Sequence, residues 1–277
     1  MFYITTLTIA GSDCSGGAGI QADIKTMSAL GVYAASAITA VTVQNTQGVQ
    51  SVYAVDAETV KNQILAVCSD LNIEYAKIGM VNDETTIRAI AEAVDIHPIP
   101  YIIIDPVMVA TSGDRLMQQD TLSIFIKRLI PKAYLLTPNI PEAEILSGMQ
   151  IRTLEDIRMA AQKIADLQCR NILIKGGHLE GNVKTDYLFC FKEDGTVEEF
   201  AFNSTTVNTN NTHGTGCTLS SAITAFLARG SKLPDAIRQA CQYVHRAIEA
   251  GSNVTIGHGH GPVNHFFEPL SLIKKNI

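Results

Sequence analysis

The sequence predicts an α/β fold in which a mostly parallel central sheet is covered by helices on both faces. Segments of strand character alternate with segments of helical periodicity almost throughout the 277 residues, and this alternation is typical of βαβ units. Residues 101–105 combine a continuous apolar run with a final aspartate, as expected of a strand buried on both faces. Because no Pro/Ser-rich linker or break in composition divides the chain, we expect a single domain over residues 1–277.

The first elements already show the alternation. Residues 5–10 are a short β-rich run that predicts a strand, and a glycine-rich loop leads from it to a helix at residues 21–30. Residues 37–43 predict the next strand. Residues 57–71 are amphipathic at the helical period and predict the helix that follows.

The same pattern continues through the middle of the chain. Residues 76–79 predict a strand and residues 84–94 a helix, before the buried strand at residues 101–105. A helix is predicted at residues 116–129 and a short strand at residues 134–137.

The last part of the chain adds a hairpin. Residues 185–191 and 196–202 flank Glu193-Asp194-Gly195, which signals an antiparallel β-hairpin near the edge of the sheet. The remaining elements are predicted from periodicity and apolar runs: helices at residues 141–146 and 154–167, a strand at 171–175, and closing helices at 218–228 and 233–250.

Polar residues and glycines follow the predicted strands. In parallel sheets, ligands bind outside the carboxyl ends of the strands, so the residues at these positions are the candidates for a functional site. They are Gly11-Ser12-Asp13, Gln44-Asn45, Gly79-Met80, Asp105-Pro106-Val107, Thr137-Pro138-Asn139 and Lys175-Gly176-Gly177.

Residues 211–217 (NTHGTGC) open directly onto the apolar segment 218–228. Two glycines before a helix allow backbone N–H groups to point at a ligand, and the helix N-terminus favours negative charge. We therefore expect an anion site here, and we expect the same field to favour the thiolate of Cys217. His213 stands four residues before Cys217, so the two could pair as base and nucleophile, although no third orienting residue is evident.

A second glycine-rich loop, residues 11–19 (GSDCSGGAG), has neither the Gly-Lys-Ser/Thr ending of a Walker A loop nor the spacing of a dinucleotide fingerprint. Close approach of the backbone to a small ligand and a plain tight turn are the two interpretations. Asp23 follows at the start of the next helix. It either complements the helix dipole or accepts a hydrogen bond from a ligand.

Three oxygen-bearing residues and one lysine suggest a metal-phosphate site. Asp105 ends an apolar strand, where an unpaired carboxylate would be costly. Glu142 follows Asn139 by three residues, and together with Asp105 they offer the oxygen ligands that Mg²⁺ takes. Alternatively, Glu142 is only a helix-start acid. Lys175 precedes two glycines, where it would either reach a phosphate or extend into solvent.

Composition excludes several classes of protein. The net charge of −6 provides no basic face for nucleic acid, and no apolar run approaches the roughly 18–20 residues of a membrane span. The six cysteines contain no CxxC pair, which argues against disulfides and structural zinc and fits a reducing cytoplasm. The N-terminus lacks the features of a signal peptide. We expect a cytoplasmic protein.

With these pieces assembled, the whole chain resembles the ribokinase-like superfamily, and most closely its hydroxymethylpyrimidine/phosphomethylpyrimidine kinases. The residues that carry the resemblance are 8–13 (TIAGSD), 15–23 (SGGAGIQAD), 44–46 (QNT), 77–80 (KIGM), 105–108 (DPVM), 137–139 (TPN) with Glu142 and Ala143, 175–178 (KGGH), 211–217 and 261–263 (GPV).

The resemblance implies a three-layer sandwich and an ATP- and Mg²⁺-dependent kinase. Its substrates would be 4-amino-5-hydroxymethyl-2-methylpyrimidine and then the monophosphate, giving the diphosphate used in thiamine biosynthesis. It also implies a homodimer. The implied substrate-binding residues are Gln44, Asp23, Gly11, Met80 and Val107; those for ATP are Lys175, Asn208, Thr215 and Gly216; those for Mg²⁺ are Asp105, Asn139 and Glu142; and the catalytic residues are Cys217, Lys175, Gly214, Thr215 and Gly216.

Cys217 stands where the related sugar kinases carry an aspartate base. It either takes the hydroxyl proton as a thiolate or merely lines the site while loop N–H groups stabilise charge. Two other functions remain to be weighed. A pyridoxal/pyridoxine kinase of the same fold would use the same phosphate machinery, although the amide of Gln44 suits an aminopyrimidine edge. A non-catalytic pyrimidine- or nucleotide-binding protein would not need a metal-phosphate clamp.

Overall fold

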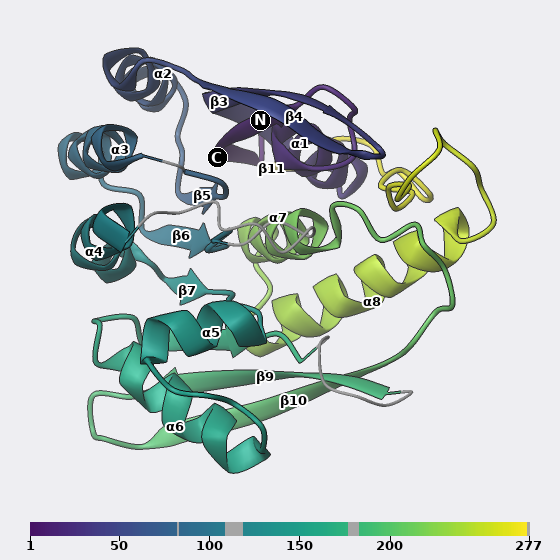
Figure 1. Ribbon diagram of the computed structural model, residues 1–277. Coiled ribbons are helices and arrows are strands. Elements are labelled where there is room, and N and C mark those ends of the chain that lie inside the picture. The colour runs from purple at the N-terminus through teal and green to yellow at the C-terminus, as the bar shows by residue number, and fades with distance from the viewer. Residues whose placement is uncertain (82, 109–118, 177–182, 276–277) are drawn as a thin grey trace.

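The computed structural model describes residues 1–81, 83–108, 119–176 and 183–275, and shows a central sheet between two layers of helices (Figure 1). The predicted α/β class is therefore confirmed. Leu116, at the start of a predicted helix, and Gly177 and His178, in a predicted strand-end motif, lie outside the described residues. No helix in the described ranges is both long and apolar enough to cross a bilayer.

The strands are β1 (Phe2–Tyr3), β2 (Thr5–Asp13), β3 (Tyr33–Asn45), β4 (Gly48–Ala54), β5 (Tyr75–Ile78), β6 (Tyr101–Ile104), β7 (Leu135–Leu136), β8 (Asn171–Ile174), β9 (Val183–Phe191), β10 (Val197–Thr205) and β11 (Lys274–Lys275). The helices are α1 (Gly19–Ala29), α2 (Ala57–Asp70), α3 (Glu84–Ile96), α4 (Gln119–Arg128), a 3₁₀ turn (Ile130–Lys132), α5 (Ile140–Ser147), α6 (Leu154–Ala165), α7 (Thr215–Ala228) and α8 (Leu233–Gly251).

In the described ranges the main sheet has nine strands, in the order β10-β9-β8-β7-β6-β5-β2-β3-β4. The six strands from β8 to β3 are parallel, so their carboxyl ends meet at one edge. The predicted hairpin is confirmed as β9–β10, with β9 antiparallel to β8.

Some elements were not predicted from the sequence. β4 pairs antiparallel with β3 at the other edge of the sheet, and β1 pairs with β11 in a small separate sheet. Most side chains of β4 are exposed, so the strand lacks the apolar run or clean alternation by which buried strands are recognised.

Each face of the sheet has its own core. Alternate residues of a strand point to opposite faces, and accordingly Ile104 packs with α2–α6 while Ile103 packs with α1, α7 and α8. Figure 1 shows α2, α3 and α4 along one side of the sheet and α1, α7 and α8 along the other. Residues 218–228 of α7 are all buried, which fixes the N-terminus of α7 in place among the strand ends.

Candidate active site

The predicted anion loop forms at the N-terminus of α7. Gly214 is the N-cap with φ +82°, and a Cβ atom there would overlap the carbonyl oxygen of Gly17, so only glycine fits. Thr215 donates its N–H to the carbonyl of Thr212 at 3.3 Å. In the described part of the chain the N–H groups of Gly216 and Cys217 have no acceptor. Two open donors at a helix N-terminus are the feature by which helices bind anions.

Lys175 and Asp105 lie directly beside this loop. Lys175 Nζ is 2.7 Å from Asp105 Oδ1, which also accepts a hydrogen bond from Thr137 Oγ1 at 3.0 Å. A Cβ atom on Gly216 would lie 3.4 Å from Asp105 Oδ2 and 3.7 Å from Lys175 Nζ. The loop, the lysine and the carboxylate, which are far apart in the sequence, therefore converge at one point.

The charges in this cluster support one another. Burial by itself would raise the pKa of Asp105, but the nearby ammonium groups of Lys175 and Lys77 outweigh it and lower the pKa. Burial would likewise lower the pKa of Lys175, and the carboxylates of Asp105 and Glu142 outweigh it and raise the pKa. Asp105 is thus an ionised group, with Oδ2 facing the loop.

Glu142 and Asn139 form a capping box at the start of α5. Asn139 Oδ1 accepts from the N–H of Glu142 at 2.9 Å, and Glu142 Oε2 accepts from the N–H of Asn139 at 2.8 Å. Asn139 also forms a β-bridge with Lys175, which ties the box to the cluster. Burial, opposed by Lys175 and reinforced by the charge of Asp105, raises the pKa of Glu142 to about 7. The interpretation of Glu142 as a helix-start acid is confirmed.

A fully buried ion pair, missed by the sequence analysis, lies under the loop. Lys77 Nζ lies 2.9 and 2.8 Å from Asp23 Oδ1 and Oδ2. Thr8 Oγ1 and Ser221 Oγ each donate to the same carboxylate at 2.6 Å. Three side chains make four hydrogen bonds to Asp23, which has no exposed surface. A substrate group would therefore have to displace one of these donors. The sequence does contain one signal of this ion pair: a lysine within a short apolar strand, because a buried ammonium group needs a buried partner.

Cys217 is not the activated thiolate that its helix position predicted. Burial raises the pKa of the Cys217 thiol to about 11; Lys77 lowers it, and the carboxylates of Asp23 and Asp105 raise it further. The expectation failed because the helix terminus is not the dominant influence once the sulfur is surrounded by protein. At neutral pH this thiol is protonated.

Of the predicted substrate residues, Gly11 contacts Met80, and Gln44 lies beside His213 of the loop. A Cβ atom on Gly11 would overlap the methyl carbon of Met80, so these two are in contact. Val107 follows Asp105 and donates its N–H to the Asp105 carbonyl at 2.9 Å. Gln44 lies within the end of β3 rather than after it, 3.3 Å from His213 Nε2 through its amide nitrogen.

One prediction about the loop residues differs from what the structure shows. His213 does not pair with Cys217; its Nε2 lies 2.9 Å from Asp13 Oδ2. The partner of His213 is 200 positions away in the chain, so no local spacing could reveal it. Asn208 lies exposed between β10 and α7, and no hydrogen bond within the described ranges connects it to the cluster.

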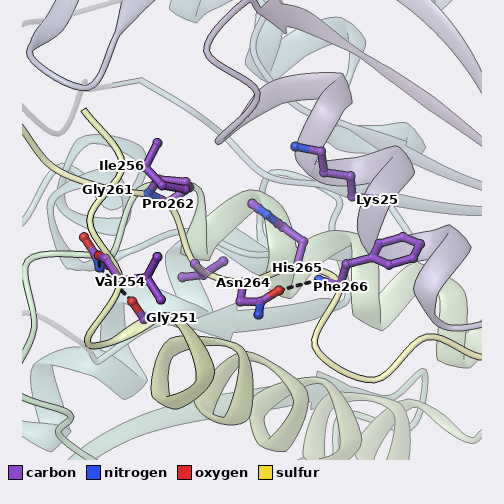
Figure 2. Close-up of a pocket in the computed structure, with 11 residues that line it drawn as sticks. Lys25, Gly251, Val254, Ile256, Gly261, Pro262, Asn264, His265 and Phe266 are labelled. Atoms are coloured by element: carbon purple, nitrogen blue, oxygen red, sulfur yellow. Dashed lines mark hydrogen bonds between the residues drawn. The ribbon is translucent and has the colours of Figure 1, made fainter.

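A pocket of about 560 Å³ lies apart from this site, near the C-terminal end of α8 (Figure 2). None of the predicted site residues lines it. Lys25 on its wall already donates to the carbonyl of Gly16 at 2.8 Å. The segment 261–263 borders the pocket and hydrogen-bonds to His213, which connects it to the loop. The strand-end cluster, and not this pocket, is the candidate active site.

His265 on the pocket wall gives the protein a specific pH dependence. It is 4% exposed, and burial lowers its pKa to about 4. An unfolded histidine has a pKa of about 6.5, so below that pH the unfolded chain takes up a proton that the folded chain does not. The contribution of His265 to the free energy of unfolding is therefore complete above about pH 6.5 and is lost as the pH falls toward 4. Between pH 7 and pH 5 the group is expected to remove about 2 kcal/mol from the free energy of unfolding.

Urea unfolding at the two pH values tests this expectation. His265→Gln should lose about 2 kcal/mol less than wild type between pH 7 and pH 5. His258→Gln, at an exposed position, should keep the wild-type loss. An equal loss in all three proteins would rule out His265 as the source.

Comparison with known proteins gives a consistent picture. Residues 13–264 match the family model described as Phosphomethylpyrimidine kinase. The chain is 44% identical over 267 residues to a Hydroxymethylpyrimidine/phosphomethylpyrimidine kinase of Bacillus subtilis, with 96% of each chain covered. It is 45% identical to the Thiamine biosynthesis bifunctional protein ThiED of Geobacter sulfurreducens, covering 94% of this chain and 52% of that protein. Its structure is similar to that of the pyridoxal kinase from Staphylococcus aureus in complex with ADP, with a TM-score of 0.86, 31% identity and 98% of each chain covered.

Proposed function

The chain belongs to the phosphomethylpyrimidine kinase family, and from this premise we propose that it phosphorylates 4-amino-5-hydroxymethyl-2-methylpyrimidine and then its monophosphate, with ATP as donor, to supply thiamine biosynthesis. The protein is a kinase, as its full-length relatives are. The observation that carries the proposal is the convergence of the open N–H groups of the α7 loop with Lys175 and Asp105.

The ATP phosphates would lie on the loop. The N–H groups of Gly216 and Cys217 would donate to phosphate oxygens, Gly214 and Thr215 would shape the turn, and Lys175 would neutralise charge that moves onto the leaving phosphate. Asn208 would contact the nucleotide from the loop that leads to α7. The solved relative with ADP supports the use of a nucleotide by this fold.

The residues near Asp105 fit a Mg²⁺ ion. Asp105 Oδ2 is ionised and faces the loop, and the second buried carboxyl, Glu142, has its pKa raised partly by the charge of Asp105. A divalent cation relieves such repulsion between buried carboxylates. Asp105, Glu142 and Asn139 provide the oxygen donors that Mg²⁺ prefers. When bound, the ion would neutralise charge on the transferred phosphoryl group.

The acceptor would lie between the loop and the end of β3. Gln44 would pair with the polar edge of the pyrimidine, while Gly11, Met80 and Val107 would form the walls of its pocket. Asp23 would act from beneath by holding Lys77 and Ser221, because its own oxygens are all engaged. The substrate hydroxyl would then attack the γ-phosphorus as the bond to ADP breaks.

Cys217 then has the role of a neutral contact. A thiol with a pKa of about 11 is almost entirely protonated at neutral pH, so it cannot accept the proton of the substrate hydroxyl. Phosphoryl transfer also depends more on positioning than on a strong base. We expect Cys217→Ala to lower kcat by the same factor, less than about tenfold, for the alcohol and for the monophosphate acceptor. Single-turnover rates on both acceptors measure this. A larger loss with the alcohol than with the already anionic monophosphate would restore the thiolate-base hypothesis.

A pyridoxal kinase activity is the second candidate, and the similarity to a pyridoxal kinase structure favours it. Both acceptors carry a hydroxymethyl group on a flat nitrogen heterocycle. Our proposal requires a higher kcat/KM for the pyrimidine alcohol than for pyridoxal. A coupled assay of ADP release with the alcohol, the monophosphate and pyridoxal distinguishes the candidates. A preference for pyridoxal would overturn the substrate assignment, and no Mg²⁺-dependent ATP consumption with any acceptor would favour a binding protein.

We further propose a homodimer formed through the β3–β4 edge. Its strands expose apolar side chains that a monomer would leave in water: Val41, Val43, Val49, Val52 and Tyr53. All six cysteines are free thiols, which supports a reducing compartment such as the cytoplasm. The residues of the site come from most of the chain, which supports a single domain over residues 1–277.

A further inference from the structure

Four side chains from three distant parts of the chain meet at the substrate end of the site: Asp13, Thr42 with Gln44, and His213. His213 Nε2 lies 2.9 Å from Asp13 Oδ2 and 3.3 Å from Gln44 Nε2. Thr42 Oγ1 lies 3.3 Å from Gln44 Oε1 and 3.0 Å from the carbonyl oxygen of Ser12. The hydrogens of this network decide which way the amide of Gln44 faces.

Asp13 determines the state of His213. Burial by itself would raise the pKa of Asp13, but hydrogen bonds from His213 and Ser15 outweigh it and lower the pKa well below its usual range. Asp13 Oδ2 also accepts the N–H groups of Gly17 at 3.2 Å and Ala18 at 2.9 Å. An ionised carboxylate only accepts. His213 Nε2 must therefore carry a hydrogen, and it has no lone pair left to accept one. That single hydrogen is directed mainly at Asp13, 2.9 Å away, and a carbonyl oxygen of Gln44 at the 3.3 Å position can share it as the weaker part of a three-centre hydrogen bond. An amide N–H of Gln44 at that position would face another N–H.

Thr42 presents an acceptor to the amide of Gln44, as the following contacts show. A hydroxyl has one hydrogen, and the shorter contact directs that of Thr42 to the carbonyl of Ser12. Toward Gln44, Thr42 Oγ1 is then an acceptor. The amide carbonyl of Gln44 belongs beside the donor His213, and its NH₂ belongs beside the acceptor Thr42.

We propose that Asp13 and His213 are specificity-determining residues that hold the Gln44 amide in this single orientation. One carbonyl lone pair and one N–H of Gln44 then remain for the substrate. They match the adjacent amino group and ring nitrogen of an aminopyrimidine, whereas pyridoxal has no exocyclic amine beside a ring nitrogen. His213 and Asp13 are thus positioning residues. The inference rests on the proposed function and adds to it the means of selecting the substrate.

The test is the ratio of kcat/KM for the pyrimidine alcohol to kcat/KM for pyridoxal. His213→Leu removes the donor and is expected to lower this ratio about tenfold or more, through KM for the alcohol, with little change for pyridoxal. His213→Gln places an amide N–H near the Nε2 position and should keep the ratio within about threefold. His245→Leu is the matched control, because His245 pairs with Glu249 one turn along α8, at 3.2 Å, and lies outside the candidate site.

A double-mutant cycle shows whether the effect passes through the amide. In a Gln44→Met background, His213→Leu should no longer change the ratio. An unchanged ratio in His213→Leu, or the same fall in both backgrounds, would overturn the inference. If His213→Leu does not fold, the kcat/KM ratios of His213→Gln and Gln44→Met are compared. Ratios that agree within about threefold would overturn the inference, because His213→Gln should keep the selectivity that Gln44→Met loses. Failure of the proposed function is a separate result, since wild type would then not phosphorylate the alcohol at all.

Discussion

Lys175→Met is expected to lower kcat by about a thousandfold, since removing a preorganised donor at the transferred phosphoryl group typically costs two to three orders of magnitude. The ammonium of Lys175 is held 2.7 Å from Asp105 Oδ1 beside the open N–H groups of the α7 loop. Methionine keeps most of the side-chain volume but removes the charge. Steady-state rates with saturating ATP and pyrimidine alcohol measure the loss.

The control for this variant is Lys192→Met. Lys192 pairs with Glu198 at 2.9 Å on the exposed β9–β10 hairpin, so its loss should leave kcat unchanged. Unfolding curves of both variants show whether the protein is still folded. A kcat of Lys175→Met within tenfold of wild type would remove Lys175 from the catalytic residues.

Lys77→Met is expected to lower the free energy of unfolding by about 3–5 kcal/mol, because it leaves the buried carboxylate of Asp23 without its counter-ion. Neither member of this pair has any exposed side-chain surface. The double variant Lys77→Met/Asp23→Asn should recover at least half of the loss, since the remaining amide is uncharged. Urea unfolding provides the measurement.

The surface pair of Lys61 and Glu92 is the comparison for this effect. Its side chains are partly exposed and 3.0 Å apart, and Lys61→Met should change the free energy of unfolding far less than Lys77→Met, because solvent screens a surface ion pair. If Lys77→Met were as mild as Lys61→Met, Lys77 would not be the essential partner of Asp23.

The sequence predicted those parts of the fold and site that depend on local pattern. Apolar runs and helical periodicity located every strand from β5 to β8 within a few residues, because burial on both faces imposes the pattern directly. The strand-end rule then placed Asp105 and Lys175 in one region, and the structure brings their side chains together. The glycines before α7 predicted, for the same local reason, that its N-terminal N–H groups are open to a ligand.

Other features depend on contacts that no local pattern encodes. The pairing of Lys77 with Asp23 spans 54 positions and that of His213 with Asp13 spans 200. The pKa of Cys217 depends on how deeply the sulfur is enclosed, and position in the helix predicted a shift in the wrong direction. β4 was missed because an exposed edge strand needs no apolar pattern.

The contact between the two glycine-rich loops joins residues that are made early and late during synthesis. Gly214 packs on the backbone of Gly17, and His213 is tied to residues 261–263 by backbone hydrogen bonds. All nine strands of the main sheet, by contrast, lie within the first 205 residues. A chain emerging from the ribosome therefore has the whole sheet before it has the phosphate loop or its support. The candidate active site is therefore completed after the sheet. A chain that ends before residue 261 would retain every strand of the nine-stranded sheet while losing the segment that holds His213 in place.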